Sequence, residues 1–403
     1  MHRLIPGALL TAGLALAATG ASAQETVRFW FHFDNPDNPM ADLVAEFEAA
    51  HPDIRIEAEN VPWNSYYDNL YTAIVGGNAP DAAMVKMFAQ PRLIEMGALE
   101  PIGERIDAWD GKADILDNLF ELNSAADGTR YYLPIQYVVL YLYYRADMFA
   151  EAGLEPPATC EEFRDAAIAL TQDTDGDGNP DTYGFGFRGG RGGHDHWATF
   201  VLPQSDGFDA LTSEAGIAAS QWVIDLHRVD QVFPPSAPND GFQEIIGAFQ
   251  SGITAMTIHH IGSSADMVAA LGDNVSAVPV PECGGGRWTS FGDESTAIFA
   301  ASEVKDAAWE WISFLSSAGA NARFNEATGQ LPVTRTDSEA WDRHESRFVE
   351  ATVNSLPFAA LLPNLPETSD FVNTVWPVAM QRALTGEISA EEMNAEIAAL
   401  YGN

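Results

Sequence analysis

The stretch Tyr131–Asp147, YYLPIQYVVLYLYYRAD, decides how this chain is organised. It contains an X-Pro step at Leu133-Pro134 and then a run of β-branched, aliphatic and aromatic residues from Ile135 to Tyr144. That composition is typical of a buried strand. Helix and strand patterns alternate both before and after it. We therefore interpret the stretch either as the segment where the backbone crosses between two lobes or as the central strand of one large sheet. A cleft between two lobes would be a natural ligand site.

Length and charge narrow the class of protein. The chain has 403 residues, which suggests about two domains of ordinary size. Asp and Glu number 58 against 20 Lys and Arg, so the net charge is −38. This acidity disfavours nucleic-acid binding, because the phosphate backbone would be repelled. It also disfavours adhesion to an anionic membrane through a basic patch. High solubility is its simplest consequence.

Residues 1–23 have the features of an export signal. Arg3 supplies the positive charge, Leu4–Ala18 is apolar, and Ala21-Ser22-Ala23 matches a cleavage site. We expect cleavage after Ala23. No cysteine lies near that point, so no lipid anchor is expected. No later apolar run reaches about 18 residues, so the sequence predicts an exported, soluble product without a transmembrane helix.

Helix and strand patterns alternate in the first part of the mature chain. A strand pattern at Thr26–Phe31 precedes a helix whose apolar residues, at i, i+3, i+4 and i+7, begin at Met40. Strand patterns at 54–58 and 82–85 flank a second helix. This β-α-β-α-β order predicts a mainly parallel sheet with helices on both faces. Capping boxes begin further helices at Thr159 and Ser389.

Several blocks of the chain resemble the extracellular solute-binding proteins of ABC importers, in the group (family 1) that includes maltose-binding and other sugar-binding proteins. The blocks include FWFHFDNPDNPMADLVAEFEAAHPDI, VPWNSYYDNLYTAIVGGNAPDA, LPIQYVVLYLYYRADMFAEAGL, GAFQSGITAMTI, STAIFAASEVKDAAWEWISFLSS, GQLPVT and RALTGEISAEEMNAEI. They occur in the right order and cover essentially the whole mature chain. No single block is diagnostic, but the ordered set is fairly specific.

The resemblance implies an α/β, two-lobed periplasmic-binding-protein fold. Each lobe would be a mainly parallel sheet flanked by helices, and hinge strands would join the lobes. We expect residues 24–133 plus 296–332 to form lobe 1 and residues 134–295 plus 333–403 to form lobe 2. Further crossings are expected near Phe291–Ala300 and near Leu331-Pro332-Val333.

The resemblance also implies a function. The protein would be a periplasmic monomer that binds a mono- or oligosaccharide between its lobes and delivers it to a transmembrane permease. It would need no cofactor. A secreted carbohydrate-active enzyme is the alternative, and a sensor module that presents its ligand to another membrane partner is a third. The sequence contains no G-x-S-x-G, H-E-x-x-H or P-loop motif.

Aromatic side chains are candidate ligand contacts, because the C–H faces of a sugar pack on aromatic rings. With ten tryptophans in the chain, many must belong to the core. The candidates that lie where the family pattern places ligand contacts are Trp63, Tyr137, Trp197, Trp288 and Trp376.

Polar candidates lie near expected strand ends or crossings, where ligands bind in open α/β sheets. Each is equally compatible with a cap or a surface group. They are His32, Asp34 and Asn35 after the first strand, Asp81 and Lys86 beside the strand at 82–85, Gln136 in the first crossing, and Asp293 and Glu294 in the second.

A basic cluster stands out in so acidic a chain. Arg188, Arg191, His194 and His196 lie within nine residues among glycines, and His259-His260 are expected in a loop that faces them. Because arginine binds carboxylates and phosphates bidentately, the ligand could be a uronate or a sugar phosphate. A solvated loop with salt bridges is the alternative. The segment around His194 could also hold zinc, although the spacing indicates no third ligand.

An acidic loop resembles the first part of an EF-hand calcium site. Its candidate ligands alternate, a glycine at position 6 permits the sharp turn, and the usual Glu at position 12 is missing. The alternatives are a structural calcium ion and an Asp/Gly-rich turn without metal. The candidate ligands are Asp173, Asp175, Asp177, Asn179 and Asp181.

Two cysteines, Cys160 and Cys283, are present. Export permits a disulfide, but the sequence alone leaves open whether the two sulfur atoms come within bonding distance. A bridge would be structural. Cys160 stands where the family often has Trp, and the loops expected at Gly292-Asp293 and at His259-His260 also depart from the family pattern.

Overall fold

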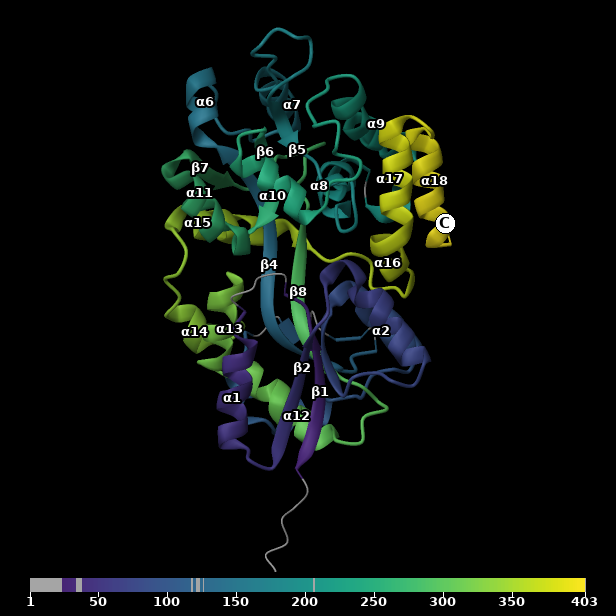
Figure 1. The fold of residues 1–403 in the computed structure, drawn as a ribbon. Coiled ribbons are helices and arrows are strands. Elements are labelled where there is room, and N and C mark those ends of the chain that lie inside the picture. Colours follow the sequence, from purple (N-terminus) through teal and green to yellow (C-terminus); the bar gives the residue numbers. More distant parts are fainter. Residues whose placement is uncertain are drawn as a thin grey trace, which may run out of the picture.

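Two long strands connect the two lobes of the protein. The computed structural model describes residues 24–33, 38–116, 119–120, 124–125, 127–205 and 207–402, so the predicted export signal lies outside the described part. Strands β4 (Tyr132–Arg145) and β8 (Thr289–Ile298) run along the long axis of the molecule, from one lobe into the other (Figure 1).

Strand β4 belongs to both lobes. Its first half pairs antiparallel with β8, from Tyr132 to Val139. Its second half pairs antiparallel with β6 (Thr254–His260) and β7 (Val275–Val278). Leu133 and Leu142 of this one strand lie in two different hydrophobic cores. The interpretation of this stretch as a crossing between lobes is therefore confirmed. The exact lobe boundaries stay a prediction.

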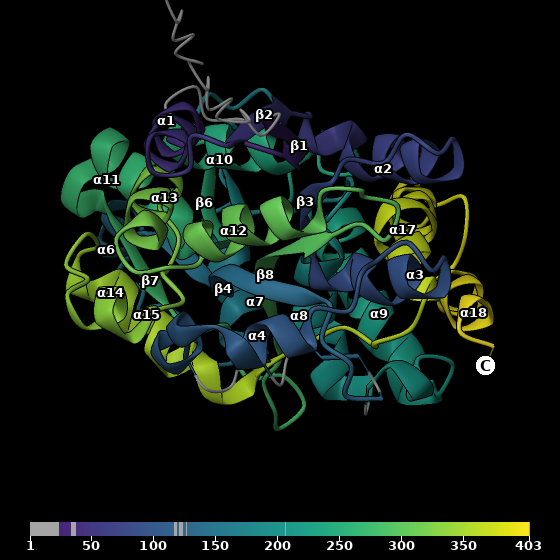
Figure 2. The ribbon, with the colours of Figure 1, turned by 90° about the horizontal axis from the view of Figure 1, so that it is seen from below.

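The first lobe contains the predicted parallel sheet. Strand β1 (Glu25–Phe31) pairs in parallel with β2 (Ile54–Asn60) and with β3 (Ala82–Lys86), and β8 pairs antiparallel with β3 and continues the sheet to the first half of β4. In Figure 2 this lobe is seen end-on, with α12 lying between α1 and α4. Its helices are α1 (Met40–Ala50), α2 (Tyr66–Val75), α3 (Gln90–Glu95), α4 (Gly103–Ala108), α12 (Lys305–Leu315) and α13 (Ala320–Thr328).

The second lobe differs from the mainly parallel sheet expected of it. Only β5 (Tyr183–Gly186) pairs in parallel with β6, whereas β4 runs antiparallel to both β6 and β7 because it arrives from the other lobe. The strand order is β2-β1-β3-β8-β4-β6-β5, and the short strand β9 (Ala359–Ala360) pairs with β8.

Helices surround this second sheet. The last two of them pack side by side at one edge of the lobe (Figure 1). They are α6 (Ala146–Ala152), α7 (Cys160–Ala169), α8 (His194–Ser205), α9 (Glu214–Arg228), α10 (Phe242–Gln250), α11 (Ser264–Leu271), α15 (Ser346–Ser355), α16 (Glu367–Asp370), α17 (Trp376–Thr385) and α18 (Ala390–Leu400). The short helix α14 (Arg335–Glu339) instead lies beside α13 of the first lobe, where its Asp337 accepts a hydrogen bond from the Gly319 amide (Figure 1). Among the described helices, none has both the length and the apolar character needed to cross a bilayer.

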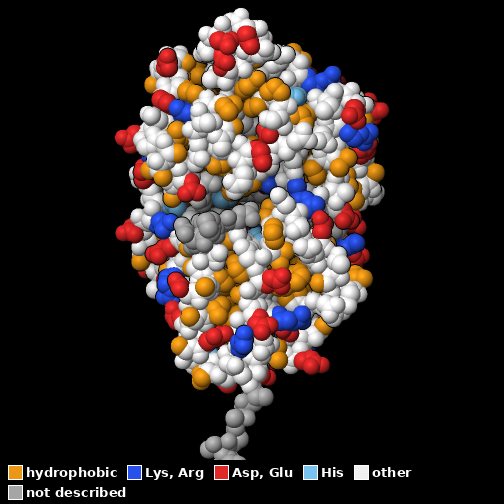
Figure 3. Space-filling model, in the orientation of Figure 1, with side chains coloured by type: hydrophobic (Ala, Val, Ile, Leu, Met, Phe, Trp, Pro, Cys, Tyr) orange, Lys and Arg blue, Asp and Glu red, His pale blue; other side chains and the backbone are white. Residues whose placement is uncertain are grey.

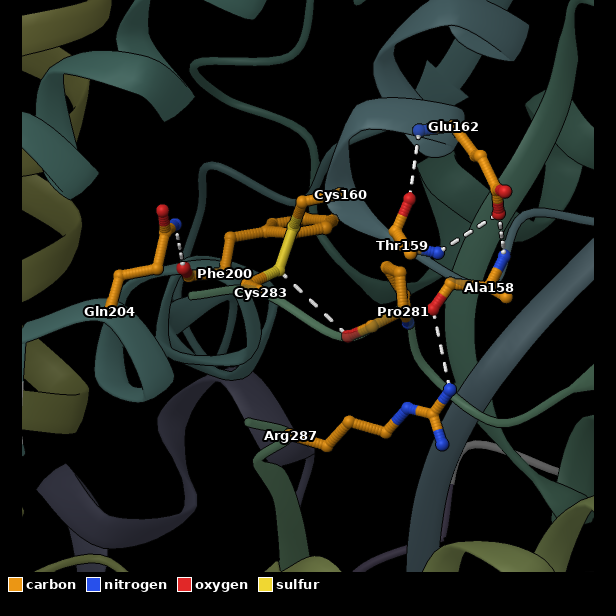
Figure 4. The surroundings of a disulfide bond; sticks show 9 residues. All are labelled: Ala158, Thr159, Cys160, Glu162, Phe200, Gln204, Pro281, Cys283 and Arg287. Atoms are coloured by element: carbon orange, nitrogen blue, oxygen red, sulfur yellow. Dashed lines mark hydrogen bonds between the residues drawn. A yellow bond between two sulfur atoms is a disulfide. The ribbon is translucent and has the colours of Figure 1, made fainter. Parts of the chain in front are cut away.

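A disulfide and a capping box fix the start of α7 (Figure 4). Cys160 is bonded to Cys283, with 5.2 Å between their Cα atoms, so the structure forms the bridge that the sequence left open. Beside it, the Thr159 hydroxyl accepts a hydrogen bond from the Glu162 amide, and the Glu162 carboxylate accepts one from the Thr159 amide. The predicted capping box is confirmed, as is the one at the start of α18.

Candidate ligand-binding cleft

A cleft of about 640 Å³ lies between the lobes, within the range of small-molecule sites. Figure 3 shows histidine and basic side chains at the waist of the molecule. The first lobe and the hinge segments contribute His32, Phe33, Trp63, Lys86, Phe88, Gln136, Val138, Glu294 and Gln330, and the second lobe contributes Arg188, His194, Asp195, His196, Phe242, His259 and His260.

Glu294 is the most heavily hydrogen-bonded carboxylate of the cleft. It lies in β8 directly across from Lys86 in β3 and from Gln136 in β4. Its oxygens accept hydrogen bonds from Lys86 Nζ (2.9 Å), His32 Nε2 (2.9 Å) and Gln136 Nε2 (3.1 Å). Burial by itself would raise the pKa of Glu294, but Lys86 and His32 outweigh it and lower that pKa to about 2. Glu294 is therefore a fixed negative charge at neutral pH.

An aromatic surface lies beside this charge. Trp63 begins a single 3-10 turn before α2 and is half-buried in the cleft wall. The ring of His32 lies 4.8 Å from the Trp63 ring, and Lys86 Nζ lies 5.3 Å from the ring centroid of Trp63. Such a ring can pack against the C–H face of a sugar while neighbouring polar groups bind its hydroxyls.

Arg188 follows β5 and faces the cleft from the second lobe. Its backbone amide donates to His196 Nδ1 (3.2 Å), and His196 Nε2 donates to the carbonyl of Ile258 (2.9 Å). These two contacts require the neutral Nε2–H tautomer. Burial, with Arg188 beside it, lowers the pKa of His196 to about 3, and burial also lowers the pKa of Arg188 to about 10.

His259 and His260 end strand β6 and lie 4.3 Å apart, measured between ring centroids. They belong to the strand rather than to the loop expected from the sequence, because both pair with β4. His260 Nδ1 accepts a hydrogen bond from the Gly262 amide (3.1 Å). Burial, with Lys86 and Arg188 nearby, lowers the pKa of His260 to about 3, and burial also lowers that of His259. Both rings are neutral at pH 7.

The structure brings many of the predicted site residues to this cleft. The argument from strand ends and crossings found the polar residues of the first lobe and hinge, the aromatic argument found Trp63, and the basic cluster found those in the second lobe. The predicted residues that line the cleft are His32, Trp63, Lys86, Gln136, Arg188, His194, His259, His260 and Glu294.

Four predicted aromatic residues pack elsewhere. Trp197, in the first turn of α8, and Trp376, at the start of α17, are fully buried in the second-lobe core. Trp288 packs against the same core, and Tyr137 stacks on Phe291 with 6.2 Å between ring centroids. Apolar packing accounts for all four, and none of them lines the cleft.

Two predicted polar residues have structural partners outside the cleft. Asp81 accepts hydrogen bonds from the Arg28 amide (2.9 Å) and from the Ser302 hydroxyl (2.8 Å), which fixes the entry to α12. Arg191 donates to the carbonyl of Asn64 (2.6 Å) and pairs with Asp68 at 3.3 Å, so it links the two lobes. Asp34 and Asn35 lie outside the described residues, as does the side chain of Asp293; Gly292-Asp293 lies within β8, not in a loop.

The sequence interpretation missed several cleft residues. Asp195 and Gln330 supply polar groups, and Phe242 together with the segment Leu361–Asn364 supplies other walls. Gln330 directly precedes the crossing expected near Leu331. Gln136 was selected because it is a polar residue at a crossing, and the same rule would have selected Gln330. No sequence pattern marks Leu361–Asn364, which reaches the cleft through the pairing of the neighbouring β9 with β8.

The acidic loop gathers three of its predicted ligands. Carboxylate oxygens of Asp173, Asp175 and Asp177 lie within 4.8 Å of one another on the exposed surface. Asp181 instead accepts from the amide and the hydroxyl of Thr174. Among the described residues, no other group of three or more His, Cys, Asp or Glu side chains comes this close, including those around His194.

Comparison with known proteins agrees with this architecture. The family model described as bacterial extracellular solute-binding protein matches residues 34–322. The mannitol-binding protein of Pseudomonas aeruginosa is 26% identical over 97% of this chain and 95% of its own. The sn-glycerol-3-phosphate-binding periplasmic protein UgpB of Brucella abortus is 25% identical over 92% of both.

A solved structure shares the fold over nearly the whole chain. The ABC transporter solute-binding protein of Thermotoga lettingae, solved with α-D-tagatose, superposes with a TM-score of 0.81 at 24% identity, covering 93% of this chain and 98% of that one. The chain belongs to the bacterial extracellular solute-binding proteins.

Proposed function

We propose that this protein is the substrate-binding component of an ABC importer, and that it captures a carbohydrate or polyol in the cleft between its lobes. The observation that carries the proposal is the composition of that cleft. An ionised Glu294, held by three donors, stands beside the half-buried ring of Trp63. Sites that bind polyhydroxylated molecules usually combine a few fixed polar groups with an apolar aromatic face.

Relatives support this class of ligand. The names of two of them specify mannitol and sn-glycerol-3-phosphate, and the Thermotoga lettingae protein was solved with tagatose. All three molecules carry several hydroxyl groups on a short carbon chain. A ligand of this kind fits a cleft of about 640 Å³.

The mechanism we propose is lobe closure. The ligand touches both lobes only when they are closed, so its binding shifts the population towards the closed state. Strands β4 and β8, and the segment near Leu331, would flex as hinges. The protein would act as a monomer in the periplasm after cleavage behind Ala23. In its closed form it would deliver the bound ligand to a transmembrane permease. Determination of the N-terminal sequence of the exported protein tests that cleavage.

The alternative of a carbohydrate-active enzyme is less well supported. A glycosidase needs one carboxyl group that donates a proton and a second that acts as base or nucleophile. With a pKa of about 2, Glu294 carries no proton to donate at neutral pH. Long incubation with oligosaccharides should therefore release no new reducing ends, and their appearance would favour the enzyme.

We also propose a structural calcium ion in the loop that contains Asp173, Asp175 and Asp177. Three oxygen donors that converge on one point suit calcium, a hard cation. No step of ligand binding depends on this ion.

A thermal-shift screen of the mature protein tests the proposed function. Ligands that bind only the folded state raise the melting temperature by mass action. We expect a rise with at least one monosaccharide, oligosaccharide or polyol, and a loss of that rise in Trp63→Ala. A panel of amino acids and short peptides serves as the control, and stabilisation by that panel alone would refute the carbohydrate assignment.

A further inference from the structure

We propose that the ligand carries an anionic group, a carboxylate or a phosphate, that binds the guanidinium group of Arg188. The inference rests on the proposed function and narrows its ligand class from sugars and polyols in general to their acidic derivatives. It assigns the two ends of the cleft different tasks: charge recognition at Arg188 and hydroxyl recognition at Glu294.

The guanidinium group of Arg188 is partly buried at the cleft and has no close anionic partner. Its Nε atom is buried and has no hydrogen-bond acceptor. Within the described residues, no carboxylate oxygen lies within 4.0 Å of its side-chain nitrogens. Asp195 and Glu244 attract it only from farther away. Partial burial without a counter-charge is unfavourable for a cation, and an anionic group of the ligand would supply the missing partner.

The glycine-rich loop after β5 is built around this side chain. A Cβ atom on Gly192 would lie 2.6 Å from Arg188 Nη2, and one on Gly193 would lie 1.7 Å from the Arg188 carbonyl oxygen. Gly189 and Gly190 donate to the carbonyls of Ala237 and Asp240, both at 2.9 Å. The loop therefore closes tightly on Arg188 and holds it in place, which a solvated surface arginine would not require.

The other charged groups deep in the cleft already have close partners. Lys86 is paired with Glu294 at 2.9 Å, and Asp195 contacts His194 at 3.2 Å. The neighbouring His196 has both ring nitrogens engaged. At this end Arg188 Nε, His194 Nδ1 and Asp195 Oδ1 have no hydrogen-bond partner, and among these groups only the planar guanidinium of Arg188 has the donor geometry that matches a carboxylate or a phosphate.

The opposite end of the cleft has the complementary chemistry. Glu294, with three donors already bound, has about one acceptor position left for a hydroxyl group, and the face of Trp63 can cover a C–H surface. A molecule that satisfies both ends has hydroxyls at one end and an anion at the other. Uronates, aldonates, sugar phosphates and polyol phosphates are the compounds with that polarity.

Matched pairs of ligands test the inference by titration calorimetry. The pairs are glucose and glucuronate, galactose and galacturonate, mannitol and mannitol 1-phosphate, and glycerol and sn-glycerol 3-phosphate. Each is measured with the wild type, with Arg188→Gln and with Arg287→Gln. The last substitution removes the same charge from an exposed residue outside the cleft.

We expect at least one acidic member to bind about 10- to 100-fold more tightly than its neutral partner. Arg188→Gln should abolish that preference, and Arg287→Gln should keep it. The pair that shows the preference identifies a carboxylate or a phosphate. Equal or tighter binding of the neutral members would overturn the inference and leave the proposed function intact. An acidic preference that survives Arg188→Gln would also overturn it. Absence of binding by any member would contradict the proposed function, and with it the inference.

Discussion

Lys86 and Glu294 face each other across two antiparallel strands, and Lys86 Nζ lies 2.9 Å from a carboxylate oxygen of Glu294. The pair stands where β3 of the first lobe meets the crossing strand β8. Because the side chain of Glu294 is 2% exposed, its charge depends on Lys86 and on His32 rather than on water. The same contacts that stabilise the hinge region therefore also hold the proposed hydroxyl acceptor in place.

Removing the charge of Glu294 should destabilise the protein. Glu294→Gln leaves the ammonium group of Lys86 without its anionic partner, and breaking a buried pair of this kind costs about 3 kcal/mol. Urea denaturation followed by circular dichroism measures the change. Glu95→Gln is the matched control, because Glu95 pairs with Arg92 on the surface at 3.3 Å, and such exposed pairs contribute less than about 1 kcal/mol. Equal effects of the two substitutions would contradict the account.

Acid should destabilise the protein below about pH 6.5. The pKa values of His196 and His260 are lowered from 6.5 to about 3 in the folded state, chiefly by burial. Between these values the unfolded chain binds protons that the folded chain does not. Stability is thus fully present above pH 6.5 and falls as the pH drops towards 3, by up to about 1.4 kcal/mol per pH unit for each histidine.

Denaturation at pH 7, 5.5 and 4.5 measures this slope. His260→Asn can retain the acceptor for the Gly262 amide while it removes one titrating ring, so its slope should be smaller than that of the wild type. An unchanged slope would mean that His260 is already protonated in the folded protein.

Reduction of the disulfide should weaken the second lobe without changing ligand affinity. The bond closes a loop with a sequence separation of 123, and a loop of this size corresponds to about 5 kcal/mol in the chain-entropy account. The double substitution Cys160→Ser, Cys283→Ser should lower the free energy of unfolding, measured by urea denaturation, by a similar amount. The bridge lies outside the cleft lining, so calorimetric affinity should stay the same. A large loss of affinity would show that the bridge also shapes the binding site.

The contact between Arg191 and Asp68 should favour the closed arrangement of the lobes. This exposed pair contributes at most about 1 kcal/mol, which corresponds to roughly a fivefold change in population. Arg191→Gln should increase the radius of gyration of the ligand-free protein in X-ray scattering and weaken neutral and acidic ligands alike. A selective loss of acidic ligands would instead place Arg191 in charge recognition beside Arg188.

Calcium should stabilise the acidic loop. Addition of calcium after chelation is expected to raise the melting temperature, and Asp175→Asn should reduce the rise. Asp209→Asn, which changes an acidic residue outside the loop, serves as the control. No rise in the wild type would identify the loop as a turn without metal.

Sequence patterns predicted the two-lobed fold better than they predicted the residues of the ligand-binding cleft. The crossing at β4 was visible because its apolar run is longer than one sheet needs and because helix and strand patterns surround it. His32 and Lys86 were found because polar residues at the carboxyl ends of parallel strands meet at one edge. These inferences depend on local periodicity and on topology, both of which the sequence contains.

The aromatic and long-range parts of the site were not predictable in this way. Trp63 and Trp197 look alike in sequence, and only the packing of helix α8 against α9 determines that Trp197 belongs to the core. The orientation of β4 against β6 depends on the entry of β4 from the other lobe, which no local pattern encodes. The three donors on Glu294 come from residues separated by up to 262 positions.

The most direct test of the central claim is titration calorimetry of the mature wild-type protein and of Glu294→Gln with the sugar or polyol that gives the largest thermal shift. We predict saturable binding of one ligand per chain to the wild type and an affinity at least about tenfold weaker in the variant, with its fold verified by circular dichroism. Binding of equal strength in both proteins would place the ligand outside the cleft between the lobes, and would contradict the account.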